Sequence, residues 1–396
     1  MKKLISLFIV GLILLSCSKA EVVTIVITNP LSIDRNTEMV ELPLEDVLTR
    51  LQIENSDFII IDEQKKEIPY QITSNKKILF SANVPANGKA SYILRKGTPV
   101  PVPTIVCGRQ YPERVDDIAW ENDLVAFRTY GPALQKTGER AFGYDVWTKR
   151  DTKEPVVEDR YAKDLNPDID YSYHVDYGNG LDCYKVGPTL GGGTAALMVD
   201  GNIIYPYCYK EYEILDNGPL RFTLKLSYNP LLVKENSEVI ETRIITLDAG
   251  SHLNKTTVTY SGLSEISDIV TGIVLHEPEE VAHIVANKEH AYMSYIDPTD
   301  NPRVNNGKIF IGAVFSKIPK DIKPLYFSKE EAQTERGGAN GHLLAISDYV
   351  PETEYNYYWG SAWSKAGMTP EGWDEYLNTF SQKLQNPLII NWDPVE

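Results

Sequence analysis

The sequence predicts an all-β protein, with a small N-terminal β-sandwich followed by a large antiparallel β-sandwich. Short apolar runs of strand length recur along most of the chain, and Gly, Pro, Asn or Asp residues separate many of them. Few stretches have the spacing of an amphipathic helix. At 396 residues the chain is also too long for one ordinary domain, which indicates two.

The N-terminus has the pattern of an export signal. Lys2 and Lys3 precede an apolar run over residues 4–15, which is too short to span a bilayer as a folded helix. The run ends in Leu-Leu-Ser-Cys, which matches the cleavage box of bacterial lipoproteins. We therefore expect residues 1–16 to be a signal peptide, and Cys17 to carry a lipid that anchors the protein to the bacterial outer membrane, on its periplasmic side or at the cell surface.

The charge of the chain limits its partners. The formal net charge is −16, and removal of residues 1–16 takes away two lysines and no acidic residue, which makes it −18. A chain this acidic repels nucleic acids and anionic membrane surfaces. We expect no nucleic-acid partner, and contact with the membrane through the lipid anchor only.

The sequence gives little sign of a disulfide framework or a cofactor. Cys107, Cys183 and Cys208 are an odd and widely spaced set, without a Cys-x-x-Cys pair. Gly191-Gly192-Gly193 lacks the spacing of a phosphate-binding loop. Four aspartates offer oxygen ligands that would suit calcium, but their spacing matches no EF-hand loop, so no cofactor is expected. They are Asp168, Asp170, Asp176 and Asp182.

The first domain is expected over residues 17–100. Strand-like runs lie at 22–27, 38–42, 58–61, 77–80 and 90–94, with a short helix at 44–51. Prolines at 99, 101 and 103 then favour an extended and stiff spacer. The second domain is expected over residues 101–396.

The second domain reads as many strands and one clear helix. Strand-like runs lie at 118–130, 144–150, 220–226, 239–247, 254–260, 269–276, 308–314 and 342–346. Thr369 as N-cap and Pro370 at the first helical position predict a helix near the C-terminus. A single large antiparallel sandwich suits this pattern better than several small barrels.

Residues 171–187 contain the candidate chemistry. Written as a β-segment, this stretch places His174, Asp176, Asp182 and Tyr184 on one face. Gly178-Asn179-Gly180 interrupts it, which indicates a kink, a bulge or a hairpin. The polar face is either an acid/base constellation or the solvated face of an edge hairpin.

Tyrosine is abundant around the same stretch. The chain has 24 tyrosines, and nine of them fall between residues 161 and 212. Tyrosine favours strands, and its flat amphipathic ring also suits the faces of sugars. Both explanations stay open.

Several motifs together resemble the family called domain of unknown function 4861, which consists of secreted bacterial proteins of polysaccharide-utilisation systems. They are Trp120 to Arg128, Tyr130-Gly131-Pro132, Lys149-Arg150, the His-x-Asp-x-Gly-x-Gly-x-Asp-x-Tyr pattern from His174 to Tyr184, residues 217–221, and Trp359 to Trp363. The resemblance covers most of residues 20–396. It implies a galactose-mutarotase-like β-supersandwich and, through a relative that acts in ulvan breakdown, an oligosaccharide dehydratase acting on a terminal uronic acid.

The residues fit elimination next to a uronate carboxylate. Arg128 would hold the carboxylate through its planar guanidinium, and His174 and Tyr184 would be the base and the acid, in an order that the sequence leaves open. Asp176 or Asp182 would orient the imidazole. Further substrate-binding residues are expected at Tyr130, Lys149, Arg150, Lys185, Arg221, His276, Trp359 and Trp363. The expected substrate is an anionic oligosaccharide.

Three other functions remain open. His174 with a carboxylate would serve an aldose mutarotase, which needs no arginine clamp. Asp176 and Asp182 would serve as the carboxylate pair of a glycoside hydrolase. The chain would also suit a non-catalytic lipoprotein that binds sugars through aromatic platforms.

Overall fold

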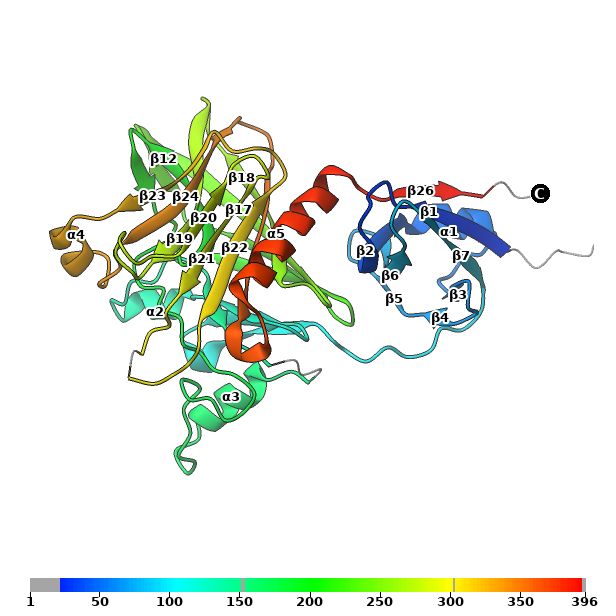
Figure 1. Cartoon of the computed structure of the whole chain (residues 1–396), viewed down its shortest axis with the longest axis horizontal. Helices are drawn as coiled ribbons and strands as arrows, with labels where there is room; N and C mark the ends of the chain where they lie inside the picture. Colours follow the sequence, from blue (N-terminus) through cyan, green and yellow to red (C-terminus); the bar gives the residue numbers. More distant parts are fainter. Residues whose placement is uncertain (1–21, 151–153, 302, 394–396) are drawn as a thin grey trace, which may run out of the picture.

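The computed structural model describes residues 22–150, 154–301 and 303–393, and it consists mostly of antiparallel β-sheet (Figure 1). A small N-terminal sandwich lies beside a larger one, which confirms the predicted fold class. The predicted signal peptide and Cys17 lie outside the described residues.

Two sheets and one helix form the N-terminal sandwich. The five-stranded sheet has the order β26 (Ile389–Trp392), β1 (Val22–Thr28), β7 (Lys89–Lys96), β3 (Phe58–Ile61) and β4 (Glu67–Ile68). The three-stranded sheet has the order β2 (Arg35–Pro43), β6 (Lys77–Val84) and β5 (Tyr70–Ile72). The predicted short helix is α1 (Leu44–Leu51), and it buries Val47 and Leu51 in the core between the sheets.

The last strand of the chain belongs to this first sandwich. β26 pairs antiparallel with β1, with Ile25 opposite Trp392. Ile390 and Trp392 pack against the N-terminal core. The predicted division at residue 100 assigns these residues to the second domain, because a four-residue apolar run does not reveal which sheet edge it will join. The two domains are therefore connected both by residues 97–106 and by the C-terminal segment.

A nine-stranded sheet forms one layer of the large domain. Its order is β14 (Glu211–Asn217), β15 (Arg221–Ser227), β17 (Asn236–Asp248), β18 (Leu253–Ser261), β25 (Tyr355–Trp363), β22 (Ile309–Phe315), β21 (Tyr292–Asp297) and β20 (Ile284–Asn287), with β16 (Leu231–Val233) paired to β17. Alternation along these strands sends one side chain in two into the core.

Two smaller sheets pack against it. One has the order β13 (Asn202–Ile204), β12 (Gly192–Val199), β19 (Ser267–Leu275), β24 (Gly341–Tyr349) and β23 (Asp321–Tyr326). The other has the order β11 (Asp145–Trp147), β10 (Ala126–Thr129), β9 (Asp117–Glu121) and β8 (Cys107–Tyr111). Residues of all three sheets share one continuous core. The short helices α2 (Pro132–Lys136), α3 (Val157–Asp164) and α4 (Lys329–Thr334) lie in the connections.

Helix α5 (Pro370–Gln385) forms as the sequence predicts. The Thr369 hydroxyl accepts a hydrogen bond of 3.1 Å from the Gly372 N–H, which caps the helix. Trp373 and Leu377 are buried against the outer face of the nine-stranded sheet. The helix then leads directly into β26, so it joins the two domains (Figure 1).

Residues 171–187 form a loop, where the alternating pattern predicted a β-segment. The Asp176 carboxylate accepts hydrogen bonds from the N–H groups of Gly178 and Gly180, at 2.9 and 3.0 Å, which closes a tight turn. Gly180 has φ of 99°, and a Cβ atom there would lie 2.2 Å from the Thr148 carbonyl oxygen. The close approach of two backbones therefore requires glycine and pulls the loop away from strand geometry.

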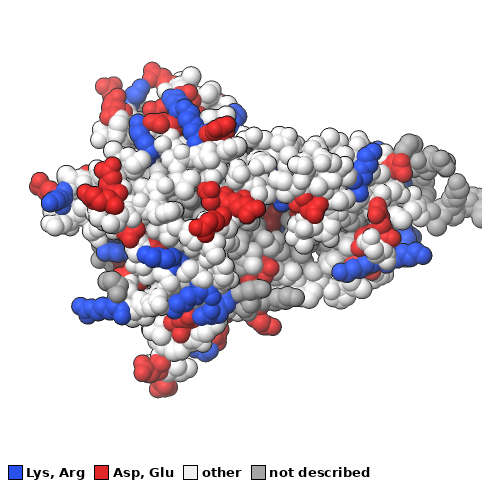
Figure 2. Space-filling model, viewed as in Figure 1, with Lys and Arg blue, Asp and Glu red and all other residues white. Residues whose placement is uncertain are grey.

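The surface carries charges of both signs. Acidic and basic side chains are interspersed over the face shown in Figure 2, rather than gathered into one acidic patch. Within the described residues, no helix has the length and apolar character needed to cross a membrane.

We predict that His342 makes the protein sensitive to acid. Its ring is fully buried, Nε2 accepts the Leu190 N–H at 3.0 Å, and burial lowers its pKa to about 3. Between pH 6.5 and pH 3 the unfolded chain binds a proton that the folded chain does not, so stability falls as pH falls. From pH 7 to pH 5 this residue should contribute a loss of about 2 kcal/mol.

Urea unfolding at the two pH values would measure this contribution. His342→Gln should reduce the pH-dependent loss by that amount, whereas His283→Gln, at an exposed position, should leave it unchanged. An identical loss in both variants would contradict the prediction.

Candidate active site

A buried charge cluster surrounds Arg128 on β10. Its guanidinium lies 2.6 Å from the Asp145 carboxylate of β11 and 3.0 Å from that of Asp182, and the Asp117 carboxylate of β9 lies at 3.7 Å. All four side chains are at most 8 % exposed. The Trp147 indole N–H also donates to Asp145, at 2.9 Å. Three carboxylates therefore compete for one guanidinium, which is already occupied by groups of the chain itself.

The crowding of carboxylates shifts their protonation. Burial, reinforced by the charge of Asp145, raises the pKa of Asp182 well above its usual range, and Arg128 only partly offsets this. Burial likewise raises the pKa of Asp117 to about 6. One oxygen of each of these two carboxyl groups is buried without a hydrogen-bond partner. The equilibrium of the Asp182 carboxyl group is therefore shifted toward its protonated form.

His174 lies at the exposed edge of this cluster. Its side chain is 53 % exposed, and Nδ1 lies 3.8 Å from the Asp182 carboxylate. Nδ1 is also 3.0 Å from the Asp182 carbonyl oxygen, which can only accept a hydrogen bond. The neutral ring therefore carries its proton on Nδ1, and Nε2 keeps the lone pair of a base. An accessible base and a carboxylic acid thus lie side by side.

Tyr184 and His276 extend the constellation on the other side. Their rings are 5.7 Å apart, and the Tyr184 hydroxyl is buried without a partner. His276 Nδ1 lies 2.6 Å from the Asp297 carboxylate. Burial alone would lower the pKa of His276, but Asp297 outweighs it and the net shift is upward. The segment that follows Asp297 is held against the loop of His174, because the Asp300 N–H donates to the Cys183 carbonyl at 3.0 Å.

Two of the predicted cations lie in or beside the 171–187 loop. Arg150 pairs with Asp176 at 3.1 Å and covers the Trp363 ring at 5.1 Å. Lys185 is exposed and donates to the Gly337 carbonyl at 2.5 Å. Within the described part of the chain, Lys185 forms no ion pair with a carboxylate. Tyr130 lies within 3.5 Å of the Arg128 guanidinium and is partly exposed.

The structure places four other predicted substrate-binding residues away from this cluster. Lys149 is buried and pairs with Glu121 at 2.6 Å. Trp359 is fully buried and stacks on Tyr144 at 4.1 Å in the main core. Trp363 is buried, and its indole N–H donates to the Asn306 carbonyl at 2.7 Å. Arg221 lies between the two domains. The spacing of the tryptophans did not reveal these positions, because β25 turns both of them inward.

Sequence reasoning also missed residues of the cluster. Asp117 and Asp145 are the first residues of their strands, and Asp297 is the last residue of its strand. Aspartate is disfavoured in strands, so an aspartate within the apolar run Tyr144 to Trp147 was the available signal. The structure offers no group of three His, Cys, Asp or Glu side chains among the described residues that could hold a metal ion.

The chain matches one family model, and it is similar to a curated relative and to solved structures, two of which are described below. The family model described as "Domain of unknown function (DUF4861)" matches residues 27–390. A relative from Formosa agariphila, described as uncharacterized protein P7, is 28 % identical over 416 residues and covers 99 % of this chain and 100 % of its own.

The two solved structures are both from Enterococcus faecalis. An α-mannosidase has a TM-score of 0.47 at 10 % identity, and a glycosyl hydrolase family 38 protein has 0.45 at 11 %. Each match covers 95 % of this chain, but 46 % and 48 % of the solved chains. The chain thus spans about half the length of these two proteins.

We predict that Arg128→Met strongly destabilises the protein. Removing the guanidinium leaves the buried carboxylates without a counter-ion, which typically costs about 3–5 kcal/mol. The folded-state pKa values of the carboxyl groups should then rise further, so the folded chain binds more protons than the unfolded one and stability falls as pH rises. Chemical unfolding between pH 5 and pH 8 would show the loss growing with pH. Arg95→Met, at an exposed position, is the control, and an equal effect in both variants would contradict the prediction.

Proposed function

The chain belongs to the DUF4861 family, and on this premise we propose that it is a carbohydrate-active enzyme, a carbon–oxygen lyase that removes water from a uronic-acid residue of an oligosaccharide. One observation carries the proposal. The accessible imidazole of His174 lies 3.8 Å from Asp182, a buried carboxyl group whose pKa is raised. An accessible imidazole and a carboxyl group whose pKa is raised supply the two kinds of group that elimination requires, a base and an acid.

The proposed step balances with these two groups. His174 Nε2 takes the proton from the carbon next to the uronate carboxylate, and the electron pair forms a carbon–carbon double bond. The bond between the neighbouring carbon and its hydroxyl oxygen breaks, and the Asp182 proton converts that hydroxyl into water. The step leaves a proton on both ring nitrogens of His174 and Asp182 as a carboxylate. Loss of the Nε2 proton to water and uptake of a proton by Asp182 from water restore the starting state.

In this proposal, the cation that binds the substrate carboxylate is Lys185 at the rim of the site and not Arg128. Arg128 is held by Asp145 and Asp182, and a substrate carboxylate would have to displace them. Lys185 is exposed and has no carboxylate partner among the described residues, which leaves its charge available to a substrate. The Tyr184 hydroxyl, unpartnered and buried, is a second donor for any group that enters the cluster.

We predict that the protein, incubated with uronate-terminated oligosaccharides, generates an absorbance near ~235 nm as a conjugated double bond forms. His174→Ala and Asp182→Asn should each lower the initial rate by about 10²–10⁴-fold, because each removes one partner of the proton transfers. His283→Ala removes an exposed histidine elsewhere and should retain the parental rate.

Other products would identify other functions. New reducing ends without this absorbance would indicate a glycoside hydrolase, and faster interconversion of anomers alone would indicate a mutarotase. Binding without turnover across a broad panel would indicate a sugar-binding lipoprotein. Each of these results would contradict the lyase proposal.

We also propose that a lipid on Cys17 anchors the protein to the outer membrane, where its oligosaccharide substrate is met. The support is the sequence pattern over residues 1–17. Cys17→Ser should release the protein from the membrane fraction of a bacterial host, whereas Cys107→Ser should not. Mass spectrometry should find the lipid on a mature chain that begins at Cys17. Retention of the Cys17→Ser chain in the membrane would contradict the proposal.

A further inference from the structure

A cleft of about 750 Å³ lies between the two domains, separate from the acid–base cluster. Its floor is the outer face of the nine-stranded sheet, and helix α5 and strands β2 and β6 form its walls. A cavity of this size falls within the range of small-ligand sites. No residue of the acid–base cluster lines the cleft.

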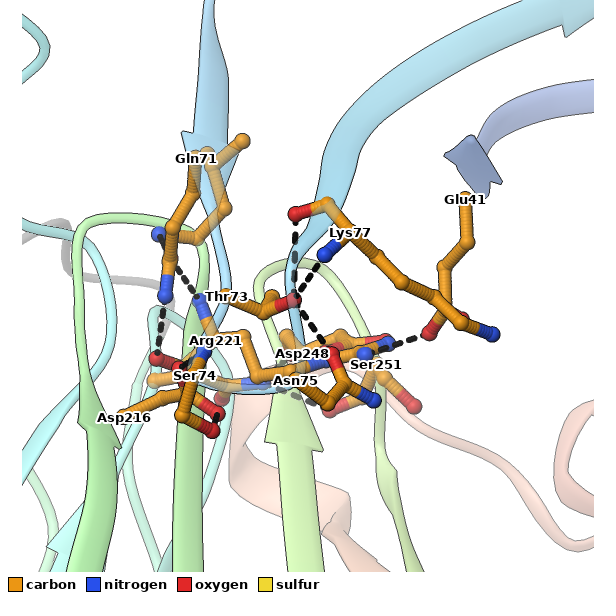
Figure 3. A network of polar contacts seen from close by, with 12 residues as sticks. Glu41, Gln71, Thr73, Ser74, Asn75, Lys77, Asp216, Arg221, Asp248 and Ser251 are labelled. Carbon is orange, nitrogen blue, oxygen red and sulfur yellow. Dashed lines mark hydrogen bonds and ion pairs between the residues drawn. The ribbon is translucent and has the colours of Figure 1, made fainter. Parts of the chain in front are cut away.

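Charged contacts fix the two domains on either side of the cleft (Figure 3). Arg221 binds both oxygens of Asp248, at 2.6 and 2.8 Å, and reaches across to Glu41 of the N-terminal domain at 2.5 Å. Asp216 accepts the Ser74 N–H at 2.7 Å, which adds a second link. The cleft is therefore formed before a ligand arrives, which lowers the free-energy cost of binding.

Two charged side chains of the lining form no ion pair with a described residue: Asp216, whose carboxylate accepts hydrogen bonds from Ser74, and Lys255. The lining contains four acidic and four basic side chains, in a chain whose net charge is −16. Lys77 and Arg221 pair with Glu41, and Lys383 lies 3.6 Å from Glu38. Lys255, exposed on β18, forms no ion pair with any described carboxylate. Its positive charge is available to a ligand.

Aromatic rings and hydroxyl groups surround this lysine. Tyr358 is the residue opposite Lys255 on β25, and its ring meets Phe380 of α5 edge-on at 5.0 Å. Thr246 is the residue opposite Lys255 on β17, and Thr223 and Thr257 also line the floor. Aromatic surface suits the apolar faces of sugar rings, and hydroxyls suit their polar edges.

We propose that this cleft is a second carbohydrate site, which binds an oligosaccharide bearing a carboxylate or sulfate group, with the acidic group on Lys255 and a sugar ring against Tyr358. The cleft is a binding site without catalysis, since its carboxylates are engaged in ion pairs or hydrogen bonds to the chain. It is independent of whether the cluster around His174 catalyses elimination.

Calorimetric titration with trigalacturonate would test the proposal. The experiment uses the His174→Ala chain, so that the probe is not consumed. Lys255→Gln in this background should weaken binding by about tenfold or more, as loss of a charge-assisted contact requires. Lys225→Gln is the matched control, because Lys225 is an exposed lysine of β15, in the same sheet but outside the lining. Thr246→Trp, which fills the floor, should also weaken binding.

The outcomes separate the possible sites. Loss of affinity in the Lys255→Gln and Thr246→Trp chains, with the Lys225→Gln chain unchanged, supports the cleft. Equal affinity in all chains, or no binding at millimolar trigalacturonate, overturns the proposal. Equal affinity for maltotriose, which has no acidic group, overturns the role of Lys255. Turnover by the parental chain is measured separately and decides only the lyase proposal.

Discussion

The buried ion cluster around Arg128 is the constraint on which the candidate active site depends. β9, β10 and β11 each contribute one charged residue, and the loop of residues 171–187 contributes Asp182. The carbonyl of the same Asp182 fixes the imidazole of His174. Burying these groups costs solvation free energy. Their contacts hold the loop on a rigid sheet. The same crowding raises the pKa of Asp182, so one arrangement both fixes the loop and favours the protonated form of this carboxyl group.

Hydrophobic alternation predicted the fold, because local side-chain spacing determines which face of a strand is buried. Capping chemistry predicted helix α5, since Thr369 and Pro370 act within one turn. The pairing of β26 with β1 joins residues more than 360 positions apart, and no local pattern encodes such a contact. The same limit hid Asp145 and Asp297, which meet the 171–187 loop only in the folded chain.

The prediction for residues 171–187 was likewise correct where it depended on residue types and incomplete where it depended on the folded backbone. The sequence drew attention to His174, Asp182 and Tyr184, and the structure brings them into one region. It does so as a loop, because Asp176 closes a turn over Gly178 and Gly180 instead of facing the imidazole. Asp176 consequently pairs with Arg150. Of these two carboxylates, Asp182 is the one that lies near the His174 ring. Residue types indicated which side chains lie in this region, while backbone hydrogen bonds decided which of them pair.

The nine-stranded sheet carries the proposed cleft on its outer face, and the sheet that holds Arg128 and Asp145 packs against its inner face. On β25, Tyr358 faces the interdomain cleft, whereas Trp359 points into the core and stacks on Tyr144, the neighbour of Asp145. In the proposed arrangement, an oligosaccharide bound in the cleft would keep a long acidic chain near the protein and raise the local concentration of its ends at the candidate active site.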